Sequence, residues 1–254
     1  MVLPSERLDG GHALVTGAGR GLGRGIALAL AELGAAVTLC ARSEDELAAV
    51  AAEIAAAGGE ATALAVDVAD PEAVDRAVVV AGRERPLTVL VTSAGLNRTG
   101  PAADYPLADW DLLMDVNVRG TFAACRAFGR ELIAAGRGGR IVTLSSQMGA
   151  VGYPSRAAYC ATKHAVNGLT KALAVEWAPH GIAVNAVAPT FVDTPFTEEM
   201  FADPEFAAEV RRRIPGGEIA TVEDVAAAVA YLASARSAAV TGHVLAVDAG
   251  WTAW

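Results

Sequence analysis

Short apolar runs alternate with longer segments of helical periodicity along the whole chain. The runs have the length of β-strands, while the longer segments repeat apolar residues at intervals of three and four positions, as amphipathic helices do. We expect strands at 12–16, 36–40, 61–66, 87–92, 139–145, 182–187 and 244–247. We expect helices at 26–33, 44–57, from 71 onwards, 107–135, 156–178 and 222–233, with a loop carrying short helices at 196–214. Strands that alternate with helices in this way predict an α/β fold, in which helices cover both faces of a parallel sheet.

Length and composition are those of a folded domain. The chain has 254 residues, of which 53% are hydrophobic, and this is ample for a sizeable buried core. It contains no repeat, no low-complexity linker and no break in composition, so we expect one domain spanning 1–254. No stretch approaches the roughly 18 uninterrupted apolar residues of a membrane span, and residues 1–11 lack the apolar core of a signal peptide. We therefore expect neither a membrane partner nor secretion.

Cysteine usage and charge argue against disulfide-bonded, metal-binding and nucleic-acid-binding proteins. Cys40, Cys125 and Cys160 are odd in number, far apart and without metal-ligand spacing, so we expect reduced thiols in a cytoplasmic protein and no metal site. The formal net charge is −9 and the isoelectric point is about 4.9. Because affinity for phosphate backbones requires a basic face, nucleic acid is not an expected partner.

A glycine-rich loop joins the first strand to the first helix. Gly17, Gly19, Gly21 and Gly23 follow the strand at once, with Leu22 among them. Glycine permits a tight turn and lets the backbone approach a pyrophosphate at a helix N-terminus. A purely structural turn is the alternative, but the context of strand, loop and helix favours a dinucleotide site.

The end of the second strand indicates which dinucleotide is bound. Many dinucleotide binders place a carboxylate there to hold the ribose hydroxyls, whereas this chain has Ala41, followed by Arg42 and Ser43. Arg20 lies in the glycine loop on the same side of the expected adenosine. Two guanidinium groups and a missing carboxylate suit a 2′-phosphate, which favours NADP(H) over NAD(H). We also expect Ser43 to form a capping box with Glu46.

Two more strand ends carry candidate cofactor contacts. Asp67-Val68 ends the third strand, where Asp67 either closes the turn or touches the adenine. The fourth strand runs into Ser93-Ala94-Gly95, whose small side chains would let a cofactor lie close to the strand end.

A tyrosine and a lysine four positions apart stand on the helix expected at 156–178. Residues at this spacing share one helix face, so Tyr159 and Lys163 would place a phenol beside an ammonium group. A nearby cation stabilises the phenolate and makes it a usable base. The alternative is a helix surface pair without function. Asn117 stands in the middle of another expected helix, where asparagine is disfavoured, and either faces water or has a role in a buried site.

Together these motifs resemble one family in order and spacing, the classical short-chain dehydrogenases/reductases. Thr16-Gly17-x-x-x-Gly21-x-Gly23 resembles its cofactor motif, and Ser93-Ala94-Gly95 resembles its Asn-Ala-Gly motif with serine in place of asparagine. Asp67 matches its adenine-side aspartate. The residues that match its catalytic tetrad are Asn117, Ser146, Tyr159 and Lys163. The resemblance covers nearly the whole chain. It implies a single-domain Rossmann fold with a doubly wound, seven-stranded parallel sheet, a cofactor half at about 1–145 and a catalytic and substrate half at about 146–254.

The resemblance also implies a role for each member of the tetrad. Tyr159 would be the general acid/base, and Lys163 would lower its pKa and bind the nicotinamide ribose. Ser146 would hydrogen-bond the substrate oxygen. Ser145 is a rival by composition, but the thirteen-residue spacing to Tyr159 selects Ser146. Asn117 would hold a water that links Lys163 to solvent.

The segment after the sixth strand completes the implied cofactor site. The family grips the carboxamide with a Pro-Gly turn, which Pro189-Thr190 replaces here. Val192 and Thr194 follow, with Thr194 in the position of the carboxamide-binding threonine.

The substrate is less well defined. Candidate contacts near the expected mouth of the site are Asn97, Gln147, Met148, Tyr153, Arg156, Phe191 and Phe196. Arg98 and Arg156 either bind an anionic group such as a carboxylate or are ordinary surface residues. This mixture of polar and aromatic side chains resembles the branches of the family that act on sugars, sugar acids and polyols, and also the 3-oxoacyl-thioester reductases. A dinucleotide sensor without catalytic activity is a more remote alternative.

Family analogy also predicts a homotetramer. The family associates through its two long helices and its C-terminal strand. The alanine-rich faces of 110–135 and 157–178 suit close packing of helices.

Overall fold

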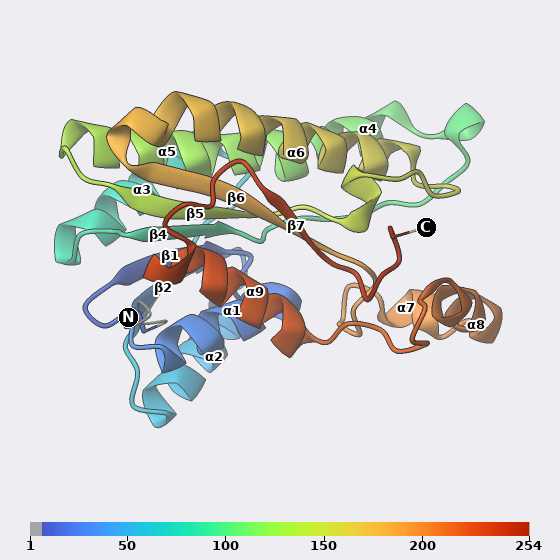
Figure 1. Ribbon diagram of the computed structural model, residues 1–254, viewed down its shortest axis with the longest axis horizontal. Helices are drawn as coiled ribbons and strands as arrows, with labels where there is room; N and C mark the ends of the chain where they lie inside the picture. The colour runs from blue at the N-terminus through green and yellow to red at the C-terminus, as the bar shows by residue number, and fades with distance from the viewer. Residues whose placement is uncertain (1–6, 254) are drawn as a thin grey trace.

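A seven-stranded parallel sheet forms the centre of the protein in the computed structural model, which describes residues 7–253 (Figure 1). The spatial order of the strands is β3-β2-β1-β4-β5-β6-β7. Their bounds are β1 His12–Thr16, β2 Ala36–Ala41, β3 Ala61–Ala65, β4 Val89–Thr92, β5 Gly139–Leu144, β6 Ile182–Pro189 and β7 Val244–Val247. The expectation of a doubly wound seven-stranded sheet is confirmed. Residues 1–6, on which the expectation about a signal peptide partly rests, and Trp254 lie outside the described residues.

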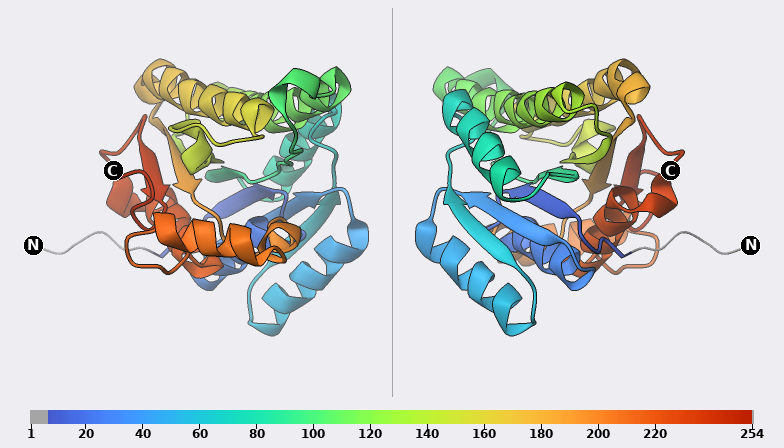
Figure 2. Two further views of the ribbon diagram at one scale, coloured as in Figure 1. Left: turned by 90° about the vertical axis from the view of Figure 1, so that its right-hand side faces the viewer. Right: turned by 90° about the vertical axis from the view of Figure 1, so that its left-hand side faces the viewer.

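Helices cover both faces of the sheet in two layers (Figure 2). One layer contains α1 Gly21–Glu32, α2 Glu44–Ala56 and α9 Val222–Ala233, and the other contains α3 Pro71–Glu84, α5 Thr121–Ala134 and α6 Ala157–Trp177. Each layer has its own core, since Ile26 and Val225 pack on one face of the sheet and Phe128 and Trp177 on the other. The five inner strands are therefore largely buried, which explains why they read as apolar runs, whereas the edge strands β3 and β7 are partly exposed.

The order of the strands reverses between β1 and β4, and this reversal positions the site. Both strands run parallel from the same edge, so the loops that follow them meet at the carboxyl edge of the sheet. Ligands of open α/β sheets bind at such a crevice. The short helices α7 Glu198–Phe201 and α8 Pro204–Arg213 project beyond this edge, at the right of Figure 1. No helix among residues 7–253 combines the length and apolar character needed to cross a bilayer.

Two expected helices differ from the structure. The first begins at Gly21, within the glycine loop and before the apolar periodicity becomes visible. The helix expected at 107–135 is interrupted, because α4 Leu107–Leu113 passes through a π-helical stretch, η2 Met114–Gly120, into α5. Periodicity of side chains does not distinguish a π-helical turn, which is common at functional sites.

Candidate active site

The glycine loop is shaped by close approaches of the backbone. Gly17 has φ +69°, and a Cβ atom there would lie 2.7 Å from the main chain of Ala94. A Cβ on Gly23 would overlap the carbonyl oxygen of Gly17. The loop is also tied to the end of β4, because the Thr16 hydroxyl accepts a hydrogen bond from the Ala94 amide at 3.2 Å. Only glycine fits at Gly17 and Gly23, so the loop presents main-chain N–H groups rather than side chains.

The N-terminus of α1 is suited to an anion. No side chain caps it at Arg20, and its first turn holds no acidic residue. Four N–H groups at a helix N-terminus lack partners within the helix, and the helix dipole adds positive potential there. This end of α1 therefore fits the pyrophosphate of a dinucleotide.

The adenosine side has two exposed arginines. Arg42 is exposed, and Arg20 is exposed with only a 3.8 Å ion pair to Glu46. Ser43 accepts a hydrogen bond from the Glu46 amide at 3.3 Å, so only this half of the expected capping box is present. Both guanidinium groups are available to a 2′-phosphate, because an exposed pair at this distance is weak.

The end of β3 supports the neighbouring loops. Asp67 accepts a hydrogen bond from the Ala69 amide at 2.9 Å and so closes the turn, the simpler of its two expected roles. Val68 is buried against Gly120, where a Cβ atom would lie 2.9 Å from the Val68 carbonyl oxygen. The third strand end is thus in direct contact with η2.

Asn117 is buried and clamps the end of β4. Its exposed fraction is 1%, so the expectation of a position facing water is wrong. Its Oδ1 accepts from the Leu96 amide at 2.9 Å, and its Nδ2 donates to the Leu96 carbonyl at 2.8 Å. Nδ2 also donates to the hydroxyl of Thr162, a contact that sequence reasoning did not identify. A Cβ atom on Gly95 would lie 3.3 Å from Asn117 Oδ1 and 3.9 Å from Lys163 Nζ, so these two side chains converge beside Gly95.

The two serines after β5 have different partners. Ser145 donates to Asn167 Oδ1 at 2.6 Å, and Asn167 in turn donates to the Gly149 carbonyl. The Ser146 hydroxyl accepts from the Met148 amide at 3.1 Å and acts on Tyr159, whose pKa it tends to lower. Ser145 is therefore held in a structural bond, and Ser146 is the serine that faces the tyrosine.

Tyr159 and Lys163 lie together at the start of α6. Lys163 Nζ is 5.5 Å from the centre of the Tyr159 ring and donates to the Leu144 carbonyl at 2.7 Å. Burial lowers the pKa of Lys163 to about 8, so the ammonium form prevails at neutral pH. The expectation of a lowered pKa for Tyr159 is not met in the protein alone, because burial raises it to about 12. Hydrogen bonding to Ser146 acts in the opposite direction, as does the positive charge of Arg156.

The segment after β6 reaches back to the glycine loop. Thr194 Cβ lies 3.8 Å from the point where a Cβ on Gly21 would be. The Thr197 hydroxyl accepts from the Thr194 amide at 3.1 Å and donates to the Val192 carbonyl. Thr197 was not identified from the sequence, although it shapes this turn. Pro189 ends β6, and the hydroxyl of Thr190 is buried without a partner.

Three of the seven expected substrate contacts lie in an aromatic cluster. Phe191 and Met148 are buried in it with Trp251, and Tyr153 packs edge-on against Phe191. Phe191 is in contact with other rings on several sides, which is the environment of a packing residue. Its role toward a substrate stays a prediction.

Other expected contacts lie at the surface or have unpaired polar atoms. Phe196 is 48% exposed, and its ring centre is 6.4 Å from that of Tyr159. Asn97 has a buried amide oxygen without a partner. Gln147 lines a hollow of about 570 Å³ between α6 and β7, with both polar atoms of its side chain buried and unpaired. The structure thus brings Phe196 to the tyrosine and places Gln147 on the α6–β7 side of Ser146.

The two arginines near the mouth differ in exposure. Arg98 is exposed, whereas Arg156 has an exposed fraction of 8%. The surface interpretation is therefore wrong for Arg156. Burial lowers the pKa of its guanidinium, and it forms no ion pair among residues 7–253.

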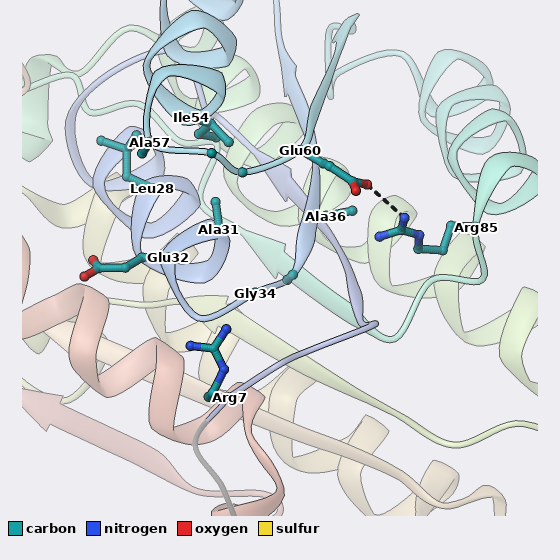
Figure 3. Close-up of a pocket in the computed structure, with 13 residues that line it drawn as sticks. Arg7, Leu28, Ala31, Glu32, Gly34, Ala36, Ile54, Ala57, Glu60 and Arg85 are labelled. Carbon is teal, nitrogen blue, oxygen red and sulfur yellow. Dashed lines mark hydrogen bonds and ion pairs between the residues drawn. The ribbon is translucent and has the colours of Figure 1, made fainter.

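Another hollow of about 590 Å³ is remote from these residues (Figure 3). It lies between α1, α2 and the segments that precede β2 and β3, at the amino edge of the sheet. Glu60 and Arg85 form an ion pair of 2.8 Å at its rim. Its position excludes it from the site described above, which uses the carboxyl edge. Residues 7–253 contain no group of three or more His, Cys, Asp or Glu side chains arranged to hold a metal ion.

The chain is similar along its length to known dehydrogenases. It is 43% identical to the galactitol 2-dehydrogenase of Rhizobium johnstonii over 98% of this chain and 97% of that protein. It is 39% identical to the gluconate 5-dehydrogenase of Gluconobacter oxydans over 96% of each protein. Among solved structures, a gluconate 5-dehydrogenase from Burkholderia cenocepacia in complex with NADP and tartrate has a TM-score of 0.94 at 36% identity, over 98% of each chain.

A family model confirms the family resemblance. The model described as enoyl-(acyl carrier protein) reductase matches residues 17–252. A short-chain type dehydrogenase/reductase from Mycobacterium marinum has a TM-score of 0.93 at 37% identity, over 97% of each chain. The chain therefore belongs to the short-chain dehydrogenase/reductase family of enzymes, which act on CH–OH groups with a nicotinamide cofactor.

Proposed function

We propose that the protein is an NADP(H)-dependent dehydrogenase that interconverts a secondary alcohol and a ketone on a small polyhydroxy substrate. The observation that carries this proposal is the convergence of Ser146, Tyr159 and Lys163 at the carboxyl edge of the sheet, beside a loop suited to a pyrophosphate. Relatives that act on galactitol and gluconate support a sugar, polyol or sugar-acid substrate.

The cofactor supplies the hydride chemistry when it is bound, and the protein aligns the reactants. In the direction of ketone reduction, Tyr159 gives its phenolic proton to the carbonyl oxygen. Because its pKa is about 12 in the protein alone, this proton is in place at neutral pH. Ser146 donates a hydrogen bond to the same oxygen, and a donor aimed at developing negative charge is worth about 10²–10³ in rate.

In the direction of alcohol oxidation, Tyr159 takes the proton, and its phenolate must be stabilised. The ammonium group of Lys163 lies 5.5 Å from the centre of the Tyr159 ring and remains charged below a pH of about 8. Lys163 and Asn117 converge beside Gly95, where a bridging water would connect them and restore the proton from solvent. In this proposal Lys163 also binds the nicotinamide ribose.

The cofactor preference rests on Arg20, Arg42 and Ala41. No carboxylate ends β2, and both arginines are exposed toward the expected 2′-phosphate. NADP bound to the Burkholderia relative supports this assignment. Thr194, Val192 and Pro189 would hold the carboxamide end, and Asp67 with Val68 the adenine end. On this basis residues 1–145 form the cofactor half and residues 146–254 the catalytic and substrate half.

Reduction of a 3-oxoacyl thioester is the alternative, and the description of the matching family model, which names an enoyl substrate on an acyl carrier, shares only the carrier with it. An acyl carrier would dock on a basic surface near the mouth, and Arg211 and Arg212 at the end of α8 are exposed there. The segment at 196–214, which we name the lid, contains more acidic than basic residues, namely Glu198, Glu199, Asp203, Glu205 and Glu209 against Arg211, Arg212 and Arg213. The lid is therefore net negative, which supports a small substrate over an acidic carrier protein.

We further propose a cytoplasmic homotetramer. Large apolar side chains stay exposed on the helices that would pair, with Trp110 and Phe122 on α4 and α5 and Val175 on α6. Exposed apolar groups on neighbouring helices suit an interface between copies of the chain. Light scattering coupled to size-exclusion chromatography would measure the mass of the assembly, and we expect four times the mass of one 25.9 kDa chain.

Replacement of Tyr159 by Phe tests the proposed chemistry. Turnover of NADP⁺ with a panel of polyols, sugar acids and hydroxyacyl thioesters should fall by about 10²–10⁴, because the positioned acid/base is lost. Binding of NADPH, followed by fluorescence, should stay nearly intact. Unchanged turnover would reject the mechanism and leave a dinucleotide sensor as the function. Tighter binding of NADH than of NADPH would reject the cofactor assignment.

A further inference from the structure

Arg156 is a buried cation without an anionic partner. Its Nε atom is buried and makes no hydrogen bond. Its Nη1 donates to the Ser155 carbonyl at 3.3 Å and its Nη2 to the sulfur of Met200 at 3.2 Å. A carbonyl and a thioether do not neutralise a guanidinium, and a buried charge without a counter-charge is costly. Such a group is retained where a ligand supplies the missing charge.

The surroundings of Arg156 add positive potential. Arg156 is the N-cap residue of α6, a helix of 21 residues whose N-terminus has no side-chain cap and no acidic residue in its first turn. The titratable groups that face the guanidinium are Tyr153, Tyr159 and Cys160, and none of them is a carboxylate. Glu209, the carboxylate beside Tyr153, is paired with Arg213 at 2.9 Å. An anion at Arg156 would thus be attracted both by the guanidinium and by the positive end of the α6 helix dipole.

The position of Arg156 relative to Tyr159 connects this charge to the reaction. Residues three apart on a helix are neighbours on one face, about 5–6 Å apart at Cβ. The two side chains interact, since the charge of Arg156 acts to lower the pKa of Tyr159. A small molecule whose hydroxyl group meets Tyr159 can therefore place a second group on Arg156.

We propose that Arg156 binds the carboxylate of the substrate, so that the enzyme acts on a hydroxy acid such as a sugar acid in preference to a neutral polyol. This assignment rests on the proposed function and narrows its substrate class. The carboxylate would replace the sulfur of Met200 as the partner of Nη2 and reach Nε as well, a geometry that the planar guanidinium suits. Met200 is in the lid segment, so the lid contacts the guanidinium that the substrate would use. Arg98, exposed in the neighbouring loop, has no such surroundings.

Matched substrate pairs test the assignment. D-gluconate with D-glucitol, and D-galactonate with galactitol, differ only in a carboxylate at the first carbon. We expect the wild-type enzyme with NADP⁺ to favour the acid of at least one pair by about 100-fold in kcat/KM, the range of a charge-assisted contact. Arg156→Met should reduce this acid-to-polyol ratio by about 100-fold, mainly through KM for the acid. Arg156→Lys should restore part of the ratio, since it keeps the charge.

Two controls separate recognition from structure. Arg98→Met removes an exposed guanidinium and should leave the ratio unchanged. Arg156→Met should unfold at the same temperature as the wild type or higher, because it removes an uncompensated buried charge; a structural arginine would give a lower temperature.

The outcomes that overturn the proposal are distinct from failure of the proposed function. If Arg156→Met lowers both members of each pair equally, the arginine acts through Tyr159 and the carboxylate assignment is wrong. Wild-type preference for the polyols, or for hexitol 6-phosphates over the acids, would also overturn it while the proposed function stands. No turnover of any pair would reject both.

Discussion

The adjacent serines after β5 allow a decisive test, because the structure assigns them opposite functions. Ser145 donates its hydrogen to Asn167 Oδ1 at 2.6 Å, whereas the Ser146 side chain acts on Tyr159 and tends to lower its pKa. Both are buried, at exposed fractions of 5% and 8%, so accessibility does not distinguish them. We compare Ser145→Ala with Ser146→Ala, two substitutions of identical size at neighbouring positions.

The expected magnitudes follow from these partners. Ser145→Ala leaves the partly buried amide oxygen of Asn167 unsatisfied, which costs about 1–3 kcal/mol of unfolding free energy. For a chain of this length each kcal/mol lowers Tm by about 2–4 °C, so Tm should fall by about 2–12 °C while kcat stays within about threefold. Ser146→Ala removes the donor to the substrate oxygen, and kcat should fall by about 10²–10³. Its stability cost is limited to the cap on the Met148 amide, about 1 kcal/mol.

Thermal unfolding followed by circular dichroism measures the first effect, and initial rates of NADP⁺ reduction at saturating substrate measure the second. The reasoning predicts a crossed result, with stability lost in one variant and turnover lost in the other. If Ser145→Ala were the inactive variant, or if both variants lost turnover equally, the assignment of Ser146 would be refuted.

Two further predictions concern the buried lysine and the glycine loop. Burial lowers the pKa of Lys163 from 10.5 to about 8, so the unfolded chain binds more protons between these values and stability rises with pH across this window, by about 3 kcal/mol. In urea titrations, the unfolding free energy of the wild type minus that of Lys163→Met should grow by this amount from pH 8 to 10.5. The subtraction cancels the opposite trend that arises from the Cys40 and Cys125 thiols, whose pKa is raised to about 12. A difference that does not change with pH would contradict the prediction. Gly17→Ala should lower Tm strongly and abolish NADPH binding, because its Cβ would collide with Ala94. Gly58 has a similar φ of +82°, but a Cβ there would have no atom within 4 Å, so Gly58→Ala should cost about 1 kcal/mol of unfolding free energy and leave NADPH binding intact. Equal effects at the two glycines would show that φ alone matters.

The sequence by itself determined the architecture and the location of the site. The alternation of apolar runs with helical periodicity predicted all seven strands, since the inner strands are covered on both faces and the partly exposed edge strands β3 and β7 are also built mainly from apolar residues. The glycines at Gly17 and Gly23 were recognisable because main-chain contact leaves no room for a side chain, and this constraint is local to the loop. The four-residue spacing of Tyr159 and Lys163 predicted a shared helix face for the same local reason.

Only the tertiary structure decided the state of each polar group. Arg98 and Arg156 are equivalent in the sequence, and the packing of a lid that begins more than 30 residues later buries one and leaves the other in water. The expected fall in the pKa of Tyr159 became a rise, because a phenol enclosed by distant segments loses its hydration whatever its neighbours in the chain. The π-helical turn around Asn117 likewise depends on contacts with the ends of β3 and β4. Burial and hydrogen-bond partners are set by residues that are remote along the chain, so they follow from the fold and not from any local pattern.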